Sequence, residues 1–398
     1  MLLDHYRALP RTVWLLGIVS LFMDASSELV HSLLPLFLVT GLGASAMMLG
    51  LIEGAAEAAA SFTKIASGAV SDWLRHRKWL AVFGYALSAL TKPLFPLAAG
   101  VEAVFAARLL DRLGKGIRGA PRDALVADVT PPDQRGAAYG LRQGLDTVGA
   151  LIGPLLAAGL MGVLAGDIRT VFWVACVPAL LAVLVLAMGV TEPPLKRNGP
   201  VPFPLRRAEL ARLGRDFWLF VGAIMMLLLP RFSEAFLLLR GQDLGLTVAE
   251  VPLVLAVMNL VAALISAPAG RLSDRIGRRG LILGGFSVLL LCHVTLSVAT
   301  TPAVVFLGAA LWGLHLGVTQ GVLSAFVADM APADLRGTAF GVFHLMSGIA
   351  ILIGSLTAGW LWDAAGAAAM FMTAAIVSIV GLVLLLAMSR RKTAGAGG

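Results

Sequence analysis

The sequence predicts an all-helical membrane protein in which twelve transmembrane helices form two pseudo-symmetric halves of six. Two observations predict this fold. The chain of 398 residues is 59% hydrophobic and only 14% charged, and its apolar runs have roughly the 20 residues that a helix needs to cross a bilayer of about 30 Å. A membrane β-barrel would show shorter, alternating segments. The second observation is that short polar landmarks recur in the same order about 200 residues later.

Each transmembrane helix is assigned to one long apolar run, and Pro230 is one of several prolines expected to kink these helices. The runs lie at 12–40, 46–70, 79–99, 102–128, 137–163, 169–190, 216–239, 248–272, 280–299, 302–329, 338–362 and 366–388. The first six form an N-terminal bundle, residues 1–191, and the last six form a C-terminal bundle with a short tail, residues 216–398. The Pro-, Gly- and Arg-containing segment 192–215 is expected to be a cytoplasmic linker.

The positive charge is distributed unevenly over this topology. The formal net charge is +8, and most Lys and Arg residues fall in loops of one side, whereas Arg169 and Arg240 fall on the other. Because cationic loops stay in the cytoplasm, both termini are predicted to be cytoplasmic. The excess charge therefore reflects topology, with anionic lipid headgroups as neighbours, and argues against nucleic-acid binding. Cys176 and Cys292 lie in apolar runs and indicate no disulfide framework.

A loop phrase occurs once in each half, after the second long apolar run. Gly270 to Arg279 reads Gly-Arg-Leu-Ser-Asp-Arg-Ile-Gly-Arg-Arg, and Gly68 to Lys78 is a looser copy of it. Two later landmarks also recur in order, Asp128 and Arg135 as Asp329 and Arg336. Shared landmarks in shared order indicate a duplicated membrane unit, which is the usual plan of a secondary transporter.

The loop phrase resembles the signature that follows helices 2 and 8 in the major facilitator superfamily, Gly-x3-Asp-Arg-x-Gly-Arg-Arg/Lys. The second copy matches every fixed position, whereas the first departs from it at Trp73, Arg75 and His76. The resemblance extends over nearly the whole chain. It implies a conformational latch, in which Asp72 faces a helix start near Gly337 and stabilises it as an anion at a helix N-terminus. The implied latch residues are Gly68, Asp72, Arg77, Asp128, Arg135, Gly270, Asp274, Arg275, Arg278, Asp329 and Arg336.

Two further stretches resemble patterns of the same family. Arg112, followed four residues later by Gly116, is similar to the helix-4 motif, whose arginine the resemblance links to proton transfer; Lys115 and Arg118 depart from the usual residues. The helix-5 pattern of proton-driven exporters is matched at Gly140, Gly149, Gly153 and Pro154. This second resemblance implies efflux rather than uptake.

Ionisable residues within the predicted helices follow helical spacing. Each costs roughly 2.5–3.5 kcal/mol at the middle of a spanning helix, so we expect them to face one another or a hydrated cavity. On the fourth helix, Asp111, Lys115, Arg118 and Arg122 share one stripe. At an offset of 201 residues, the charges of the fourth and fifth helices meet mostly neutral residues in the second half. We therefore infer that these charges are specialised to the first half and face a polar, asymmetric cavity.

Two sets of candidate functional residues follow from these charges. Residues expected to bind an anionic substrate group are Lys115, Arg118, Arg122, Arg142, Asp146, Arg231, Glu234, His315 and His344. Residues expected to take part in proton coupling are Asp24, Glu28, Glu53, Glu57 and Arg112. The alternative interpretation is that the charges form internal ion-pair networks that hold the first, second, fourth and fifth helices together, and that the histidines are packing residues.

The sequence therefore predicts a proton-coupled secondary transporter of the bacterial inner membrane that works by alternating access and exports a small organic anion or amphipathic drug-like compound. A symporter that takes up an anionic metabolite or metal-chelate, and a non-transporting receptor, are the alternatives. No nucleophile motif, zinc motif or phosphate-binding loop of an enzyme or ATPase is found. The expected partners are a small molecule, protons and membrane lipids, with no cofactor, metal or nucleic acid, and the chain is expected to be a monomer.

Overall fold

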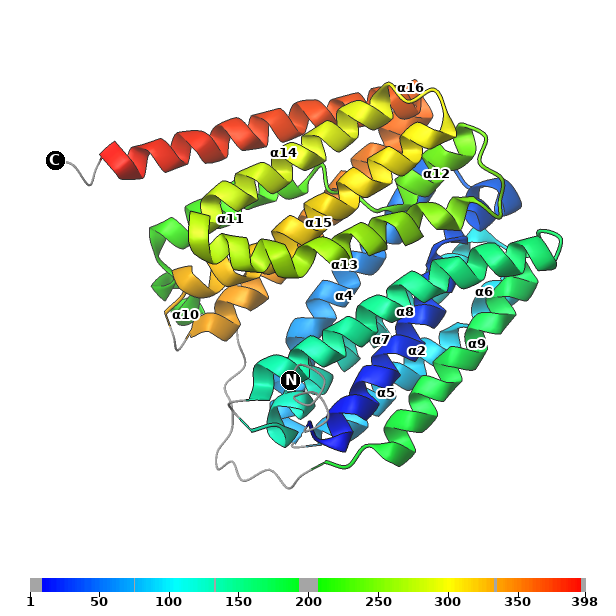
Figure 1. The fold of residues 1–398 in the computed structure, drawn as a ribbon, viewed down its shortest axis with the longest axis horizontal. Coiled ribbons are helices and arrows are strands. Elements are labelled where there is room, and N and C mark those ends of the chain that lie inside the picture. Colours follow the sequence, from blue (N-terminus) through cyan, green and yellow to red (C-terminus); the bar gives the residue numbers. More distant parts are fainter. Residues whose placement is uncertain (1–8, 75, 132–133, 193–206, 333–334, 395–398) are drawn as a thin grey trace. The chain divides into compact units, whose positions relative to one another are not determined.

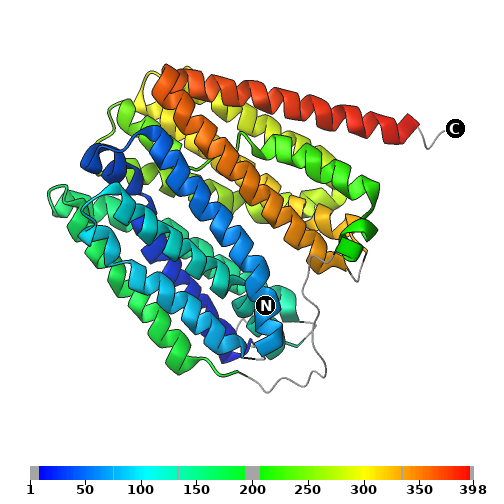
Figure 2. The same ribbon diagram turned by 180° about the vertical axis from the view of Figure 1, so that it is seen from behind.

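The computed structural model describes residues 9–74, 76–131, 134–192, 207–332 and 335–394. Within these ranges the regular elements are helices and there is no strand (Figure 1). The same helices are seen from behind in Figure 2. The predicted all-helical fold is confirmed.

The helices of the first repeat coincide with the first six predicted runs. Two runs are divided near a proline, the first near Pro35 and the third at Pro93. Proline has no backbone N–H group and therefore interrupts the hydrogen bonds of a helix. The elements are α2 (Arg11–His31), α3 (Leu34–Leu36), the π-helix η1 (Phe37–Gly41), α4 (Ala46–Leu74), α5 (Arg77–Thr91), α6 (Leu94–Leu97), α7 (Val101–Val129), α8 (Arg135–Val163), α9 (Ile168–Leu184) and the π-helix η3 (Val185–Gly189).

The helices of the second repeat follow the same order with one interruption. They are α10 (Arg207–Arg212), α11 (Gly214–Leu228), α12 (Ala235–Asp243), α13 (Val251–Ile276), α14 (Arg278–Ser297), α15 (Pro302–Met330) and α16 (Arg336–Ala394). The prediction of one continuous helix over 216–239 is wrong, because residues 229–234 around Pro230 are not helical. α16 contains two predicted runs, which meet at Gly366 with its positive φ of 83°.

Within the described ranges, eight helical stretches are long and apolar enough to span a membrane. One of them, Thr338–Ala387, covers both predicted runs of α16. The three remaining predicted runs do not meet this criterion. Two of them, α4 and α7, carry several charged residues. The third is divided into α11 and α12, which are each too short. Non-helical backbone at membrane depth is tolerated only where protein or a water-filled cavity surrounds it. Residues 229–234 are therefore expected to face the interior of the protein and not lipid.

Internal contacts divide the chain into two compact units. The first comprises Met1–Gly43, Ala55–Phe203 and Thr247–Ala256, and the second comprises Ala44–Gly54, Pro204–Leu246 and Val257–Gly398. Each unit contains most of one repeat. The first turns of α4 belong to the second unit, and the first turns of α13 belong to the first.

Small residues allow helices of the first unit to approach closely. A Cβ atom placed on Gly149 of α8 would lie 2.4 Å from the Leu21 carbonyl oxygen of α2, and one on Gly153 would lie 2.7 Å from that of Ala25. A Cβ atom on Gly114 of α7 would lie 2.5 Å from the Ser88 Oγ of α5. Close packing of this kind is typical of membrane helices, whose interfaces favour small residues.

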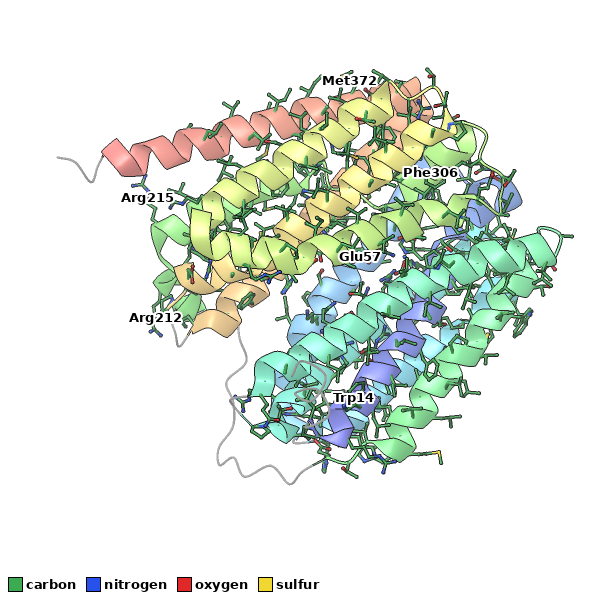
Figure 3. The ribbon with its side chains drawn as sticks, viewed as in Figure 1. Trp14, Glu57, Arg212, Arg215, Phe306 and Met372 are labelled. Carbon is green, nitrogen blue, oxygen red and sulfur yellow. The ribbon has the colours of Figure 1, made fainter. Side chains whose placement is uncertain are left out.

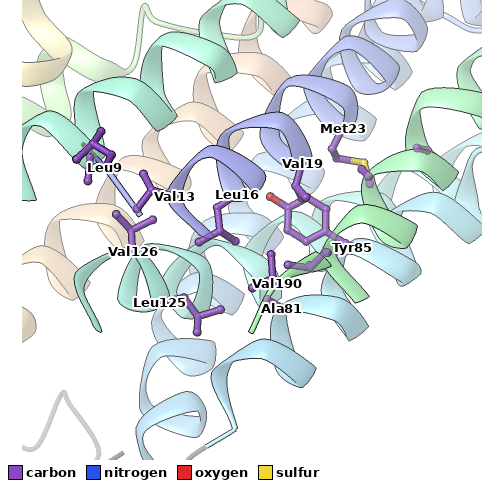
Figure 4. Packing of buried hydrophobic residues seen from close by; sticks show 14 residues of the cluster. Leu9, Val13, Leu16, Val19, Met23, Ala81, Tyr85, Leu125, Val126 and Val190 are labelled. Atoms are coloured by element: carbon purple, nitrogen blue, oxygen red, sulfur yellow. The ribbon is translucent and has the colours of Figure 1, made fainter. Parts of the chain in front are cut away.

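Apolar side chains fill one end of the first unit. Leu16, Val19 and Met23 of α2 pack with Tyr85 of α5 and Val126 of α7, and all five are fully buried (Figure 4). Tyr85 directs its hydroxyl group toward Arg122, 3.4 Å away. The apolar cluster therefore ends where the charged side chains of the same helices begin.

Candidate functional site

Seven ionisable side chains of the first unit form what we call the arginine cluster. They come from α2, α7 and α8, whose close packing brings them together. Its members are Asp24, Lys115, Arg118, Arg122, Asp123, Arg142 and Asp146. The helical spacing of the sequence predicted that the members other than Asp123 face one another or a hydrated cavity. For Asp123 the sequence favoured a place in an internal ion-pair network.

Arg122 is the most connected member. Its Nε donates to Asp123 Oδ1 at 3.1 Å, and its NH1 lies 3.7 Å from Asp146 Oδ1. NH1 also donates to Ser20 Oγ at 3.1 Å. The guanidinium group thus joins α2, α7 and α8, and its planar fork suits several acceptors at once.

Arg118 lies one helical turn away and is almost fully buried, with 3% of its surface exposed. Its NH1 donates to Ser88 Oγ at 2.6 Å, and its NH2 lies 4.0 Å from Asp24 Oδ1. The guanidinium carbon stands 4.8 Å from the centre of the Tyr85 ring, which adds a cation–π contact. Arg118 is therefore held on three sides by side chains of α2 and α5.

Arg142 approaches the same two carboxylates from α8. Its NH1 lies 3.6 Å from Asp146 Oδ1, and its Nε lies 3.8 Å from Asp123 Oδ1. Its NH2 donates to Gln143 Oε1 at 2.7 Å. Lys115 has an exposed side chain and interacts electrostatically with Asp24 and Asp146. The cationic residues are thus placed around shared carboxylates rather than in isolation.

The Asp24 and Asp146 carboxyl groups, on α2 and α8, are close enough to interact with one another. Asp24 also lies 4.0 Å from Arg118, and Asp146 lies within 3.7 Å of Arg122 and Arg142. Two neighbouring carboxylates repel one another when both are ionised. The pair is therefore a candidate carrier of a proton among four cationic side chains.

A second group of polar side chains, the lysine cluster, was not predicted as a site. Lys92 of α5 donates to Asp111 Oδ1 at 3.0 Å and to Ser27 Oγ at 3.1 Å. Arg108 NH1 lies 4.0 Å from Asp111 Oδ2. Lys92 is the only charged residue of the run 79–99, and this was the signal available in the sequence. Ser88 joins the two clusters, because its Oγ donates to the Asp111 carbonyl and accepts from Arg118.

His31 completes the lysine cluster. Arg108 NH2 lies 2.7 Å and Arg112 NH2 lies 3.3 Å from its Nδ1. A guanidinium group can only donate, so Nδ1 accepts and carries no proton. Arg112 also pairs with Glu57 of α4 at 3.2 Å, and Glu57 is labelled in Figure 3. The predicted proton-coupling residues Arg112 and Glu57 thus form a pair, while Glu28 is half-buried on α2.

Glu53 is separated from Glu57 by the division into units. It is 1% exposed, belongs to the second unit and accepts a hydrogen bond from Ser233 Oγ at 3.5 Å. The Ser233 backbone N–H donates to Ser355 Oγ at 3.1 Å. Arg231 and Glu234, both half-buried, flank Ser233 in the same non-helical segment. The break in the seventh predicted helix thus brings Ser233, which lies between these two candidate residues, to Glu53.

The two predicted histidines lie in aromatic surroundings. His315 is completely buried, its Nδ1 donates to the Gly285 carbonyl at 2.8 Å, and its ring meets Phe286 edge-on. His344 stacks on Phe340 with ring centres 6.4 Å apart. Among the described residues, no three His, Cys, Asp or Glu side chains are placed to hold a metal ion.

One arginine of each loop phrase forms an ion pair with the aspartate of the later landmark in the same repeat. Arg77 NH1 donates to Asp128 Oδ2 at 2.7 Å in the first, and Arg278 NH1 pairs with Asp329 Oδ2 in the second. Arg135 is exposed at the start of α8. Gly68 and Gly270 lie within α4 and α13. The side chains of the other predicted latch residues lie outside the described part of the structure: Asp72, Asp274, Arg275 and Arg336.

Repeated helical halves, spans of membrane length and ionised groups within the helices together define a membrane-embedded secondary transporter. The sequence profile described as Major Facilitator Superfamily matches residues 16–239 and 232–397. The chain belongs to this superfamily, as the sequence predicted.

Relatives and solved structures agree with this assignment. An uncharacterised MFS-type transporter of Methanocaldococcus jannaschii is 31% identical over 388 residues, which is 96% of either chain. The multidrug resistance protein MdtH of Edwardsiella ictaluri is 26% identical, over 84% of this chain and 82% of that protein. The nucleoside transporter NupG has a TM-score of 0.76 at 15% identity, covering 96% of this chain and 99% of that one. For the human organic anion transporter MFSD10 the TM-score is 0.69 at 21% identity, covering 94% and 99%. These structural similarities establish the fold.

Proposed function

We propose that the chain is a proton-coupled transporter that works by alternating access and exports a small organic anion or an amphipathic compound. The observation that carries the proposal is that the neighbouring carboxyl groups of Asp24 and Asp146 both lie among the arginine side chains of the arginine cluster. Such a pair binds one proton next to cations that also attract an anionic group. Loss of the proton and binding of the substrate would then change the charge of one site.

The charge of the arginine cluster favours an anionic substrate group. It contains four cations, namely Lys115, Arg118, Arg122 and Arg142, and three carboxyl groups, namely Asp24, Asp123 and Asp146. The described side chains therefore leave net positive charge at a site inside the membrane. Carboxylate and phosphate groups match the bidentate geometry of arginine.

Two of the compared proteins have names that fit this proposal. MdtH is named a multidrug resistance protein, and MFSD10 an organic anion transporter. The helix-5 pattern points the same way, and Gly149 and Gly153 of that pattern lie at a close approach between α8 and α2. A bacterial inner membrane, with both termini in the cytoplasm, is the location that the distribution of basic loops supports.

Flux in proteoliposomes tests the proposal. The purified full chain is reconstituted with carboxyfluorescein, an organic anion, or ethidium, a lipophilic cation, inside the vesicles, and an inward proton gradient is imposed. Antiport predicts that the gradient accelerates loss of the anionic probe, and that Asp24→Asn and Asp146→Asn remove this acceleration. Glu102→Gln, a change at an exposed carboxyl group at the start of α7, is the matched control. Proton-driven entry of the probe would establish symport instead, and binding without flux would establish a receptor.

A further inference from the structure

The start of α4 is completed by a carboxylate from a distant part of the chain. Asp363 of α16 accepts from the backbone N–H of Ala46 at 2.9 Å through Oδ1, and from that of Met47 at 2.8 Å through Oδ2. Ser45 Oγ accepts from the backbone N–H of Met48 at 3.1 Å. The first N–H groups of a helix have no partner within the helix, so Asp363 supplies two of the acceptors that α4 needs. Its charge also lies at the positive end of the helix dipole.

Small residues bring the first turns of α4 against α16 beside this cap. A Cβ atom on Gly50 would overlap the Ser355 carbonyl oxygen, and one on Gly359 would overlap the Ala46 carbonyl oxygen. Each helix thus presents a glycine to the backbone of the other, as membrane helices do where they approach closely. The cap by Asp363 therefore belongs to a close contact between the two helices.

The helix α4 passes from one compact unit to the other. Its first turns, within Ala44–Gly54, belong to the second unit together with α16, and it continues in the first unit from Ala55. There Glu57 pairs with Arg112 of α7 at 3.2 Å. The start of α4 is therefore bound to a helix of the second repeat, whereas the following turn is bound to a helix of its own repeat.

The second repeat begins its equivalent helix, α13, in another way. Glu250 Oε2 accepts from the backbone N–H and from the hydroxyl group of Thr247, each at 2.8 Å. The turn before α13 is thus completed by its own residues. The position 201 residues before Asp363 is Gly162, which has no side chain to offer. The cap by Asp363 is therefore specific to α4 and is not a shared feature of the duplicated unit.

We propose that Asp363 is a latch at the end of the transporter opposite the loop phrases, and that this end stays closed while the Asp363 carboxylate caps α4. The latch presupposes the alternating access proposed above. When this end opens, the start of α4 leaves α16, and the N–H groups of Ala46 and Met47 exchange the carboxylate for water. The latch residues that the family signature implies lie at the other end of α4, so the two devices act on opposite ends of one helix. Asp363 is a positioning residue, which acts on the conformational equilibrium.

Distances between spin labels at the two ends test the latch without a substrate or a proton gradient. Ala99 and Thr300 are exposed residues just before α7 and α15, at the end where α4 starts, and Pro131 and Pro332 are exposed residues just after these helices. Each pair is replaced by labelled cysteines in the full chain without its two native cysteines. Double electron–electron resonance in lipid nanodiscs then gives the distance distribution at either end.

Loss of the cap is expected to open one end and close the other. Asp363→Ala should increase the population with the longer distance between positions 99 and 300 about fivefold, the shift in an equilibrium that a helix cap typically produces. The population with the shorter distance between positions 131 and 332 should increase equally. Asp363→Asn keeps one acceptor oxygen and should have a smaller effect in the same direction. Glu250→Gln, which changes a cap confined to the turn before α13, is the matched control and should leave both distributions unchanged.

A second variant reaches the same contact without changing a charge. Gly359→Ala places a Cβ atom against the Ala46 carbonyl oxygen and should shift both distributions as Asp363→Ala does. Melting temperatures show that each variant is folded. A merely structural cap would lower the melting temperature of Asp363→Ala and leave the distances at positions 131 and 332 unchanged, and this result would overturn the proposal, as would wild-type distributions at both ends.

The flux assay separates this proposal from the proposed function. Shifted distances in a chain whose wild type shows no proton-driven flux would support the latch and contradict the proton coupling. Proton-driven flux in the wild type together with unshifted distances in Asp363→Ala and Gly359→Ala would contradict the latch alone.

Discussion

Lys92 and Asp111 form an ion pair at 3.0 Å in which the side chains are only 1% and 3% exposed. Removing one partner of a buried pair leaves an uncompensated charge, which typically costs 3–5 kcal/mol. Because Arg108 lies 4.0 Å from the same carboxylate, we expect Lys92→Met to cost about 3 kcal/mol, the lower end of this range. Equilibrium unfolding in detergent measures the loss.

The double variant provides the control for this pair. Lys92→Met combined with Asp111→Asn removes both charges, so its cost is expected to be smaller than the sum of the two single costs. Additive costs would mean that the pair contributes no coupling, and that the lysine cluster is held by other contacts.

The close contact between α8 and α2 predicts a contrast between two glycines of α8. A Cβ atom on Gly149 would lie 2.4 Å from a backbone oxygen of α2, whereas one on Gly140 would meet nothing within 4 Å. Gly149→Ala is therefore expected to cost about 1–3 kcal/mol through overpacking. Gly140→Ala is expected to be neutral or stabilising by up to about 1 kcal/mol, since alanine favours helix. Equal melting temperatures of the two variants would contradict the helix approach.

The repeated ion pairs predict unequal effects of equivalent substitutions. The side chain of Asp128 is 22% exposed in its pair with Arg77, and that of Asp329 is 57% exposed in its pair with Arg278. Water screens exposed pairs, so Asp329→Asn is expected to cost less than about 1 kcal/mol, and Asp128→Asn is expected to cost more. Melting curves at low and high salt measure both effects. A larger loss of stability in Asp329→Asn than in Asp128→Asn would contradict this prediction.

The start of α9 predicts a dependence of stability on pH. Hydrogen bonds from the Thr170 hydroxyl group and the Arg169 backbone N–H lower the pKa of Asp167 below its ordinary value of 3.8. A carboxyl group with a lowered pKa in the folded state stabilises the fold above its unfolded pKa, and this contribution is lost as the pH falls through the folded value. Asp167→Ala is therefore expected to melt at a lower temperature than the wild type at neutral pH, and this difference should shrink below pH 3.8.

Thr170→Val serves as the matched variant for this helix start. It removes the hydroxyl donor and keeps the backbone donor of Arg169, so its melting temperature is expected to fall between those of the wild type and Asp167→Ala. A difference between wild type and Asp167→Ala that is constant with pH would show that the carboxylate charge contributes nothing.

The sequence predicts much of the fold and of the arginine cluster, because both follow from local periodicity. Apolar runs of membrane length become helices, and the spacing of Asp111, Lys115, Arg118 and Arg122 places them on one face of α7. The helical period also brings Arg142 and Asp146 together on α8. These predictions need only the geometry of a single helix.

The parts that the sequence did not predict depend on how helices pack. Pro230 marks a possible kink, but the sequence does not show that Ser233, within the break at 229–234, makes hydrogen bonds to Ser355 and Glu53. Glu53 and Glu57 share a helix face in the sequence, yet they belong to different units. Lys92 is visible as a lone charge, but its partner Asp111 comes from another helix. Periodicity gives the face on which a residue lies and does not give the neighbour of that face.

The proposed function requires that Asp24 and Asp146 share one proton, and infrared spectroscopy tests this requirement most directly. Protonated and ionised carboxyl groups absorb at different frequencies, so the wild-type protein in lipid at neutral pH should show a protonated carboxyl group that disappears in both Asp24→Asn and Asp146→Asn. It should persist in Glu102→Gln. A wild-type spectrum without this signal, or one that both aspartate variants retain, would contradict the account.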